Sequence, residues 1–252
     1  MARLFQDAAG AEYNTAAPLV YGANHGFDLC RTGRGAGRPV ECPPMNYQKA
    51  VFTISAAKLK DCPPDSIREV AFAGRSNAGK SSAINSLTRQ SQLARASKTP
   101  GRTQLINFFA VDPGRYLVDL PGYGFAKVPL AVKDNWQIHL EHYLNKREAL
   151  AGLVLVTDIR HVFKDFDLMM INWARQNNIP LHILLTKSDK LKRGAIQDAI
   201  RTAKAAIADL EDASVQEFSS LKKTGIEILA NRLDEWLTPE PEESEEEVVE
   251  AQ

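Results

Sequence analysis

Between residues 45 and 238, short apolar runs alternate with longer stretches in which apolar residues recur every three or four positions. The short runs predict β-strands, and the longer stretches predict amphipathic helices. Residues 153–156 and 182–185 are apolar along most of their length, as expected for parallel strands that are buried on both faces. The expected strands are 67–73, 104–111, 115–119, 153–158, 181–186 and 215–219, and the expected helices are 79–89, 131–149, 165–177, 194–209 and 224–237.

This alternation of strands and helices predicts a doubly wound α/β fold, with a mostly parallel sheet and helices on both faces. The segments 104–111 and 115–119 are separated by Pro113-Gly114, so we expect them to form a hairpin. A hairpin here would give the sheet one antiparallel edge strand.

The two ends of the chain differ from this patterned domain at 45–238. Residues 1–44 lack sustained periodicity, and we expect a disordered N-terminal extension, with translation from Met45 as an alternative. Residues 239–252 contain seven acids and no Lys or Arg, which predicts a disordered acidic tail.

The formal net charge of zero hides an uneven distribution of charge. Once the seven acids of the tail are set aside, 31 basic residues face 24 acidic ones. Residues 1–44 hold four Arg and four acids, so this excess lies within 45–238. Such a domain suits a polyanion such as RNA, although an ordinary solvated surface explains the charge equally well.

No segment approaches the ~20 apolar residues that a membrane-spanning helix needs, so we expect no membrane insertion. The N-terminus has no apolar signal-peptide core. Cys30, Cys42 and Cys62 have neither metal-ligand spacing nor the even number of a disulfide framework. These features predict reduced thiols in a cytoplasmic protein.

Residues 74–81 fit the phosphate-binding P-loop pattern G-x-x-x-x-G-K-[ST], and they lie between an expected strand and an expected helix. Glycines in such a loop allow successive backbone N–H groups to face one anion at a helix N-terminus. Lys80 would reach the β- and γ-phosphates, and the Ser81 hydroxyl would bind Mg²⁺. The expected nucleotide-binding residues here are Gly74, Arg75, Ser76, Asn77, Ala78, Gly79, Lys80 and Ser81.

Three later segments distinguish a GTPase from other P-loop proteins. The first, Asp119-Leu120-Pro121-Gly122, follows an expected strand. Asp119 would bind Mg²⁺ through water, as the corresponding Asp does in P-loop NTPases, and the Gly122 N–H would meet the γ-phosphate.

The second segment, Thr186-Lys187-Ser188-Asp189, is similar to the base-reading N-K-x-D motif. The Asp189 carboxylate would accept hydrogen bonds from guanine N1–H and its 2-amino group, which adenine cannot offer. An unpaired buried polar group costs roughly 1–3 kcal/mol, enough for strong discrimination. The Lys187 stem would cover the base. Thr186 lacks the Asn amide that contacts guanine and ties this loop to the P-loop. We therefore expect weaker affinity for the nucleotide but unchanged selectivity for guanine.

The third segment, Ser219-Ser220-Leu221-Lys222, resembles the S-A-K loop, whose backbone N–H meets guanine O6. A GTPase also needs a Thr between the P-loop and D-x-x-G to complete Mg²⁺ coordination. Thr99 and Thr103 both qualify, and Thr103 is preferred because it is nearer the next strand.

Read together, these residues resemble the EngB (YihA/YsxC) family of TRAFAC GTPases over about residues 46–237. The matching text is G-R-S-N-A-G-K-S-S, S-K-T-P-G-R-T-Q-L-I-N, D-L-P-G-Y-G, D-I-R-H, L-L-T-K-S-D-K-L and F-S-S-L-K-K-T-G.

The resemblance implies a Ras-like P-loop NTPase fold, with Thr186 as a family trait and Thr103 as the Mg²⁺ ligand. It also implies a role in large ribosomal subunit assembly, with ribosomal particles or rRNA as partners, and a need for the protein in cell division and septation. Further nucleotide-binding positions that it implies are Gly101, Arg102, Gln104, Leu105 and Phe218.

Tyr123 stands where Ras-like enzymes carry the water-orienting Gln, which predicts slow intrinsic GTP hydrolysis. Asn77 either binds K⁺ to supply positive charge, as in related GTPases, or merely shapes the loop. Arg75 and Arg102 are further candidates for that charge. Lys80, Asn77 and Thr103 are therefore the expected catalytic residues.

We expect a monomeric GTPase switch that does not bind DNA. The alternative is a guanine-nucleotide-sensing module in septation with negligible catalysis. A small-molecule kinase is disfavoured because the chain carries 186–189 and no evident acceptor-binding lid.

Overall fold

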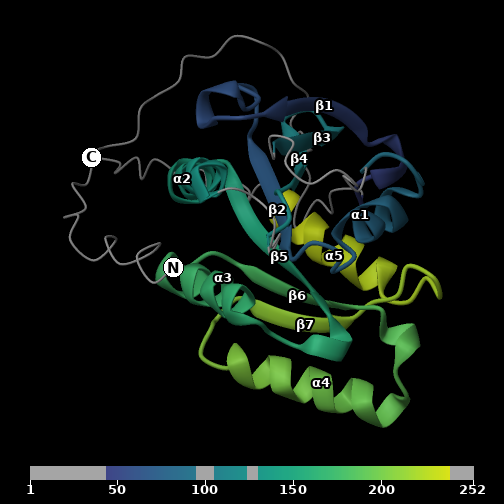
Figure 1. Cartoon of the computed structure of the whole chain (residues 1–252). Helices are drawn as coiled ribbons and strands as arrows, with labels where there is room; N and C mark the ends of the chain where they lie inside the picture. Colours follow the sequence, from purple (N-terminus) through teal and green to yellow (C-terminus); the bar gives the residue numbers. More distant parts are fainter. Residues whose placement is uncertain (1–43, 95–104, 124–129, 239–252) are drawn as a thin grey trace, which may run out of the picture. The chain divides into compact units, whose positions relative to one another are not determined.

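The computed structural model describes residues 44–94, 105–123 and 130–238, with the backbone alone at 130–137. The described strands form a seven-stranded sheet in the order β1-β3-β4-β2-β5-β6-β7 (Figure 1). The strands are β1 (Val51–Ala56), β2 (Arg68–Gly74), β3 (Ile106–Asp112), β4 (Arg115–Asp119), β5 (Leu150–Asp158), β6 (Leu181–Thr186) and β7 (Ala213–Glu217).

The expected fold class is confirmed, because β4, β2, β5, β6 and β7 all pair in parallel and β3 forms the expected hairpin with β4. The antiparallel strand is not at the edge, however. β1 pairs with the outer side of β3, so β3 lies second from the edge. β1 was not expected, because residues 51–54 are all exposed and lack the one-sided alternation of a half-buried strand.

The helices are divided between the two faces of the sheet (Figure 1). α1 and α5 contact each other and both pack on β2, whereas α2 and α3 cover the opposite face and α4 packs along β7. Among the described residues, no helix has both the length and the apolarity to cross a membrane. The helices are α1 (Lys80–Thr88), α2 (Leu130–Lys146), α3 (Asp165–Gln176), α4 (Arg193–Ala206) and α5 (Ile226–Leu237).

The face beneath α1 and α5 has an apolar core built from alternate strand residues. Val70 and Phe72 of β2 belong to one buried cluster with Ile84 of α1 and Leu233 and Trp236 of α5. The intervening residues of β2 point to the other face because side chains alternate along a strand.

The opposite face buries a carboxylate, Glu69, which has no exposed surface. Tyr143 Oη of α2 donates to Glu69 Oε2 at 2.7 Å, and Arg147 Nε donates to Oε1 at 2.9 Å. Burial, and then the neighbouring carboxylate, raise the pKa of Tyr143 well above its usual value. A buried charge is tolerated only when it is paired in this way, so the network fixes the C-terminal end of α2 against the sheet.

Gly152 in β5 lies directly beneath the ring of Trp236. An added Cβ at this position would be 2.6 Å from Trp236 Cδ2. β5 begins at Leu150, three residues before the expected strand, because Leu150 and Gly152 pair with Glu69 and Val70 of β2 despite the weak strand preference of glycine.

We predict that Gly152→Ala lowers the free energy of unfolding by about 1–3 kcal/mol, because overpacking forces the Trp236 ring to move. Gly194→Ala is the matched control. Gly194 lies in α4 and an added Cβ there meets no atom within 4 Å, so this change should be neutral or stabilise by up to about 1 kcal/mol. Urea unfolding of both variants measures the difference, and equal stabilities would contradict the packing argument.

Candidate functional site

The sequence motifs lie at the carboxyl ends of neighbouring parallel strands. Gly74 ends β2, Asp119 ends β4, Asp158 ends β5 and Thr186 ends β6. Asp158 is directly in register with Thr186, and Phe72 is in register with Asp119. Ligands of open α/β sheets bind outside this edge, so the sheet assembles one site from segments that are far apart in the sequence.

The P-loop turns sharply between β2 and α1 through two residues with left-handed backbone. Asn77 has φ +64° and Gly79 has φ +106°. The N–H of Ala78 donates to the Arg75 carbonyl at 3.0 Å and closes the turn. An added Cβ at Gly79 would lie 3.3 Å from Thr186 Oγ, so only glycine fits both the backbone angle and the space.

The D-x-x-G segment runs beside the P-loop. The N–H of Ser76 donates to the Tyr123 carbonyl at 2.8 Å, and the N–H of Tyr123 approaches the Gly74 carbonyl at 3.4 Å. An added Cβ at Gly122 would lie 3.4 Å from the Ser76 backbone. This close contact places Gly122 at the phosphate-binding loop, as the motif predicts.

Lys80 and Asp119 form a buried ion pair in this structure. Burial lowers the pKa of Lys80, to about 7, and the adjoining carboxylate opposes this by favouring the charged ammonium group. Asp119 and the Ser81 hydroxyl at the start of α1 are hard oxygen donors. They fit Mg²⁺, which usually takes one or two protein ligands and completes its shell with phosphates and water.

Thr186 ties the base-reading loop to the P-loop. Its buried hydroxyl shares its proton between the carbonyl of Ala78 in the P-loop and that of Thr157 in β5, the latter at 3.0 Å. The expectation that Thr in place of Asn removes this tie is therefore wrong. A short hydroxyl is sufficient because the two loops are already in van der Waals contact at Gly79.

Asp189 is held by the loop that follows β7. The Ser219 hydroxyl donates to Asp189 Oδ1 at 2.6 Å, and Lys190 Nζ lies 3.4 Å from Oδ2. The Ser219 hydrogen bond, followed by Lys190, holds the pKa of Asp189 below its usual value. The carboxylate is therefore charged at neutral pH and can only accept hydrogen bonds.

Asp158 is a site residue that the sequence analysis did not single out. Its Oδ2 accepts from Lys187 Nζ at 2.9 Å, and Lys187 Nζ also donates to the Asn77 carbonyl at 2.6 Å. Hydrogen bonds from Arg160 and Lys187 outweigh burial and hold the pKa of Asp158 well below its usual range. Asp158 ends β5 as Asp119 ends β4, and this shared position was the available signal.

Tyr123 is engaged by α3. Its buried hydroxyl donates to Asp167, and its ring stacks on Phe166 with a centroid distance of 3.8 Å. Burial is the main cause that raises the pKa of Tyr123 well above its usual value. A neutral phenol bound to α3 does not replace a water-orienting Gln.

Two expected nucleotide-binding residues are buried in the core next to the site. Leu120 is buried and its N–H donates to the Phe72 carbonyl at 3.0 Å. Phe218 is fully buried and its N–H donates to the Leu185 carbonyl at 2.8 Å. Their side chains therefore belong to the core. Thr99, Gly101, Arg102, Thr103 and Gln104 lie outside the described residues, which resume at Leu105.

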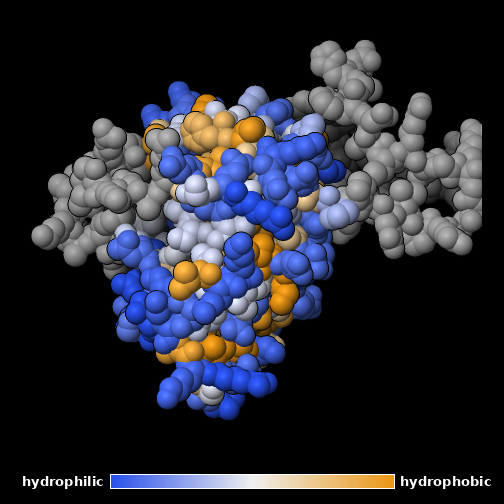
Figure 2. Space-filling model, turned by 90° about the vertical axis from the view of Figure 1, so that its right-hand side faces the viewer, coloured by the Kyte–Doolittle hydropathy of each residue, from blue (hydrophilic) through white to orange (hydrophobic). Residues whose placement is uncertain are grey.

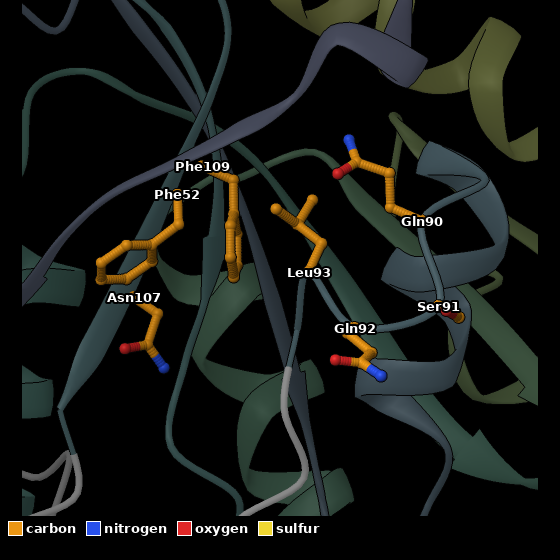
Figure 3. A pocket seen from close by; sticks show the side chains of 7 residues that line it. All are labelled: Phe52, Gln90, Ser91, Gln92, Leu93, Asn107 and Phe109. Atoms are coloured by element: carbon orange, nitrogen blue, oxygen red, sulfur yellow. The ribbon is translucent and has the colours of Figure 1, made fainter.

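A separate open hollow of about 780 Å³ lies between the outer strands and the C-terminal end of α1 (Figure 3). Phe52 of β1 meets Phe109 of β3 edge to face on its floor, with centroids 6.0 Å apart. None of its lining residues belongs to the expected nucleotide site; they are Phe52, Gln90, Ser91, Gln92, Leu93, Asn107 and Phe109.

Comparison with known proteins agrees with this site. A protein-family model described as "50S ribosome-binding GTPase" matches residues 69–187, which run from β2 to the base-reading loop. A crystal structure described as that of a probable GTP-binding protein engB has a TM-score of 0.56 and 25% sequence identity. That match covers 67% of this chain and 98% of the other.

Curated relatives match over most of their length. The "Probable GTP-binding protein EngB" of Nitrosococcus oceani is 57% identical over 192 residues, which are 76% of this chain and 96% of the relative. The protein of the same name from Idiomarina loihiensis is 55% identical over 197 residues, 78% of this chain and 96% of that relative. With the P-loop, the D-x-x-G segment and the base-reading loops assembled at one sheet edge, this chain belongs to the EngB family of GTP-binding proteins.

Proposed function

We propose that this protein is a Mg²⁺-dependent GTPase with slow intrinsic hydrolysis, which acts as a switch in assembly of the large ribosomal subunit and is needed for cell division and septation. One observation carries the guanine assignment: the Asp189 carboxylate is held in its acceptor-only form by Ser219. The description of the matching family model supports the ribosomal partner. We further propose that the protein is a monomer in the cytoplasm and that it acts on ribosomal particles or rRNA.

Guanine selection follows from the charge on Asp189. Its carboxylate accepts from the N1–H and 2-amino groups of guanine, whereas adenine presents a lone pair at N1. Lys187, anchored by Asp158 and by the Asn77 carbonyl, covers the base with its aliphatic stem. Because two contacts hold the Lys187 ammonium group, covering the base requires little further ordering of this side chain.

Phosphate binding combines charge with fixed backbone dipoles. The Thr186 hydroxyl holds the Ala78 carbonyl, and in a trans peptide the next N–H points the opposite way. The Gly79 N–H therefore points away from Thr186, toward the phosphate side of the loop. Lys80 exchanges its partner Asp119 for the β- and γ-phosphates. Ser81 and Asp119, with Thr103, would hold Mg²⁺, which neutralises charge on the transferred phosphoryl group.

Slow hydrolysis follows from the position of Tyr123, whose hydroxyl is committed to Asp167. The same observation favours a second candidate, a guanine-nucleotide-sensing module in septation with negligible catalysis. In the GTPase that we propose, Asn77 binds K⁺, which supplies the positive charge that another GTPase takes from an arginine finger.

We predict that GTP hydrolysis is faster in KCl than in NaCl and that Asn77→Gly abolishes the difference. Glycine adopts the φ of +64° at this position without strain, so the variant removes the carboxamide side chain while the left-handed turn is retained. If Asn77 merely shapes the loop, Asn77→Gly will keep the ratio of rates in the two salts. Phosphate release under multiple turnover measures this ratio, and equal wild-type rates in both salts would refute the K⁺ site.

We also predict that the protein co-sediments with large ribosomal subunits more strongly with a non-hydrolysable GTP analogue than with GDP, and that these particles accelerate hydrolysis. A switch needs a difference in affinity between its two nucleotide states. Small ribosomal subunits are the control. Binding that ignores the nucleotide would contradict the switch, and nucleotide-dependent binding without any hydrolysis would favour the sensing module.

A further inference from the structure

Four cations lie on the two loops that are expected to read the guanine base or at the start of the helix that follows one of them: Lys192, Arg193 (the first residue of α4), Lys222 and Lys223. All four side chains are exposed, and none forms an ion pair with another described residue. Residues 190–197 and 218–226 contain no Asp or Glu. We call these four residues the basic rim.

Neighbouring acids neutralise several other cations of the described chain. Arg175 pairs with Asp209 at 2.7 Å, and Arg201 pairs with Asp198 at 2.7 Å. Single exposed cations without an ion pair to a described residue also occur elsewhere, at Arg75 and Arg89 for example, so the distinguishing feature of the basic rim is that four such cations lie on two joined segments.

The two loops that carry the basic rim are joined to each other. The N–H of Ser188 donates to the Phe218 carbonyl at 3.1 Å, and the Ser219 hydroxyl bridges Asp189 at 2.6 Å and the N–H of Lys222 at 3.1 Å. The cations are thus presented by one connected structure, beside the carboxylate that selects guanine.

Lys223 has left-handed backbone, with φ +57°, where glycine is favoured. Residues other than Gly, Asn and Asp seldom adopt this conformation. The neighbouring Leu221 is 72% exposed.

In Figure 1, the loops after β6 and β7 project toward the side on which α1 lies, and Figure 2 looks onto that side. Hydrophilic residues cover most of the coloured surface of this face, and apolar areas lie near its top, on its right side and near its bottom.

We propose that the basic rim is a docking surface for the phosphate backbone of RNA. Lysine is depleted at protein–protein interfaces, whereas it is a common contact to nucleic-acid phosphates, and three of the four rim cations are lysines. The excess of basic residues within 45–238 is in agreement with a polyanionic partner. This inference rests on the proposed role on ribosomal particles and specifies where RNA binds.

The test compares Lys192→Glu/Arg193→Glu and Lys222→Glu/Lys223→Glu with the control Arg201→Glu/Lys204→Glu. The control has the same charge change on exposed residues of α4, and Lys204 lies eleven residues along the helix from Arg193, a rise of about 16 Å. Binding of a short labelled single-stranded RNA is measured by fluorescence anisotropy over a range of KCl concentrations. Affinity for GDP is measured on the same samples.

We expect each rim variant to bind RNA roughly tenfold more weakly than the wild type, with a salt slope that is less steep by about 1.4, since two phosphate contacts are lost. The control should bind RNA as the wild type does, and GDP affinity should equal that of the wild type in the control and in Lys192→Glu/Arg193→Glu. Wild-type RNA affinity in both rim variants would overturn the inference.

Co-sedimentation with large ribosomal subunits separates this inference from the proposed function. Particle binding that is lost in the rim variants supports the inference. If the wild type binds particles and the rim variants bind equally, the inference fails and the proposed function stands. If the wild type binds neither RNA nor particles, both fail. If the rim variants lose particle binding but the wild type has no affinity for RNA, the inference is overturned. The basic rim would then be a docking surface for an acidic protein.

Discussion

The hydroxyl of Thr186 connects the three segments on which nucleotide binding depends. It lies at the end of β6, beside the base-reading Asp189, and it binds the carbonyl oxygens of Ala78 in the P-loop and Thr157 in β5. Because the Ala78 carbonyl is buried beneath the loops, loss of this hydroxyl would leave it unpaired. The phosphate-binding and base-reading halves of the site are therefore held in one fixed relation.

Several neighbouring features depend on this connection. Gly79 must lack a side chain because Thr186 lies against it, and Asn77 keeps its left-handed backbone with its carbonyl held by Lys187. Lys187 is in turn held by Asp158, so each strand end supports the next. Such an arrangement is preorganised, and nucleotide binding then loses less free energy to the ordering of loops. The same connected loops also present the cations of the basic rim.

The sequence predicted those parts of the molecule that local pattern determines. Buried parallel strands are apolar along their length, and the P-loop needs particular residues at fixed spacing, so β2, β6 and the loop that joins β2 to α1 were predicted correctly. β1 was missed because its first four residues are exposed and its partner is 50 residues away in β3. The roles of Thr186 and Asp158 depend on contacts between strand ends, which a local sequence pattern does not predict. The role of Thr103 as the switch residue remains a prediction.

The affinity of Thr186→Val for GDP tests most directly whether the Thr186 hydroxyl connects the two halves of the site. Valine keeps the shape of threonine and removes the hydroxyl, so we predict an affinity weaker by about 5- to 150-fold, the equivalent of roughly 1–3 kcal/mol for the unpaired Ala78 carbonyl. Thr186→Ser should retain the affinity, as should Thr202→Val, whose hydroxyl donates to the Asp198 carbonyl on exposed α4 at 3.0 Å. A folded Thr186→Val protein that binds GDP as tightly as the wild type would contradict the account.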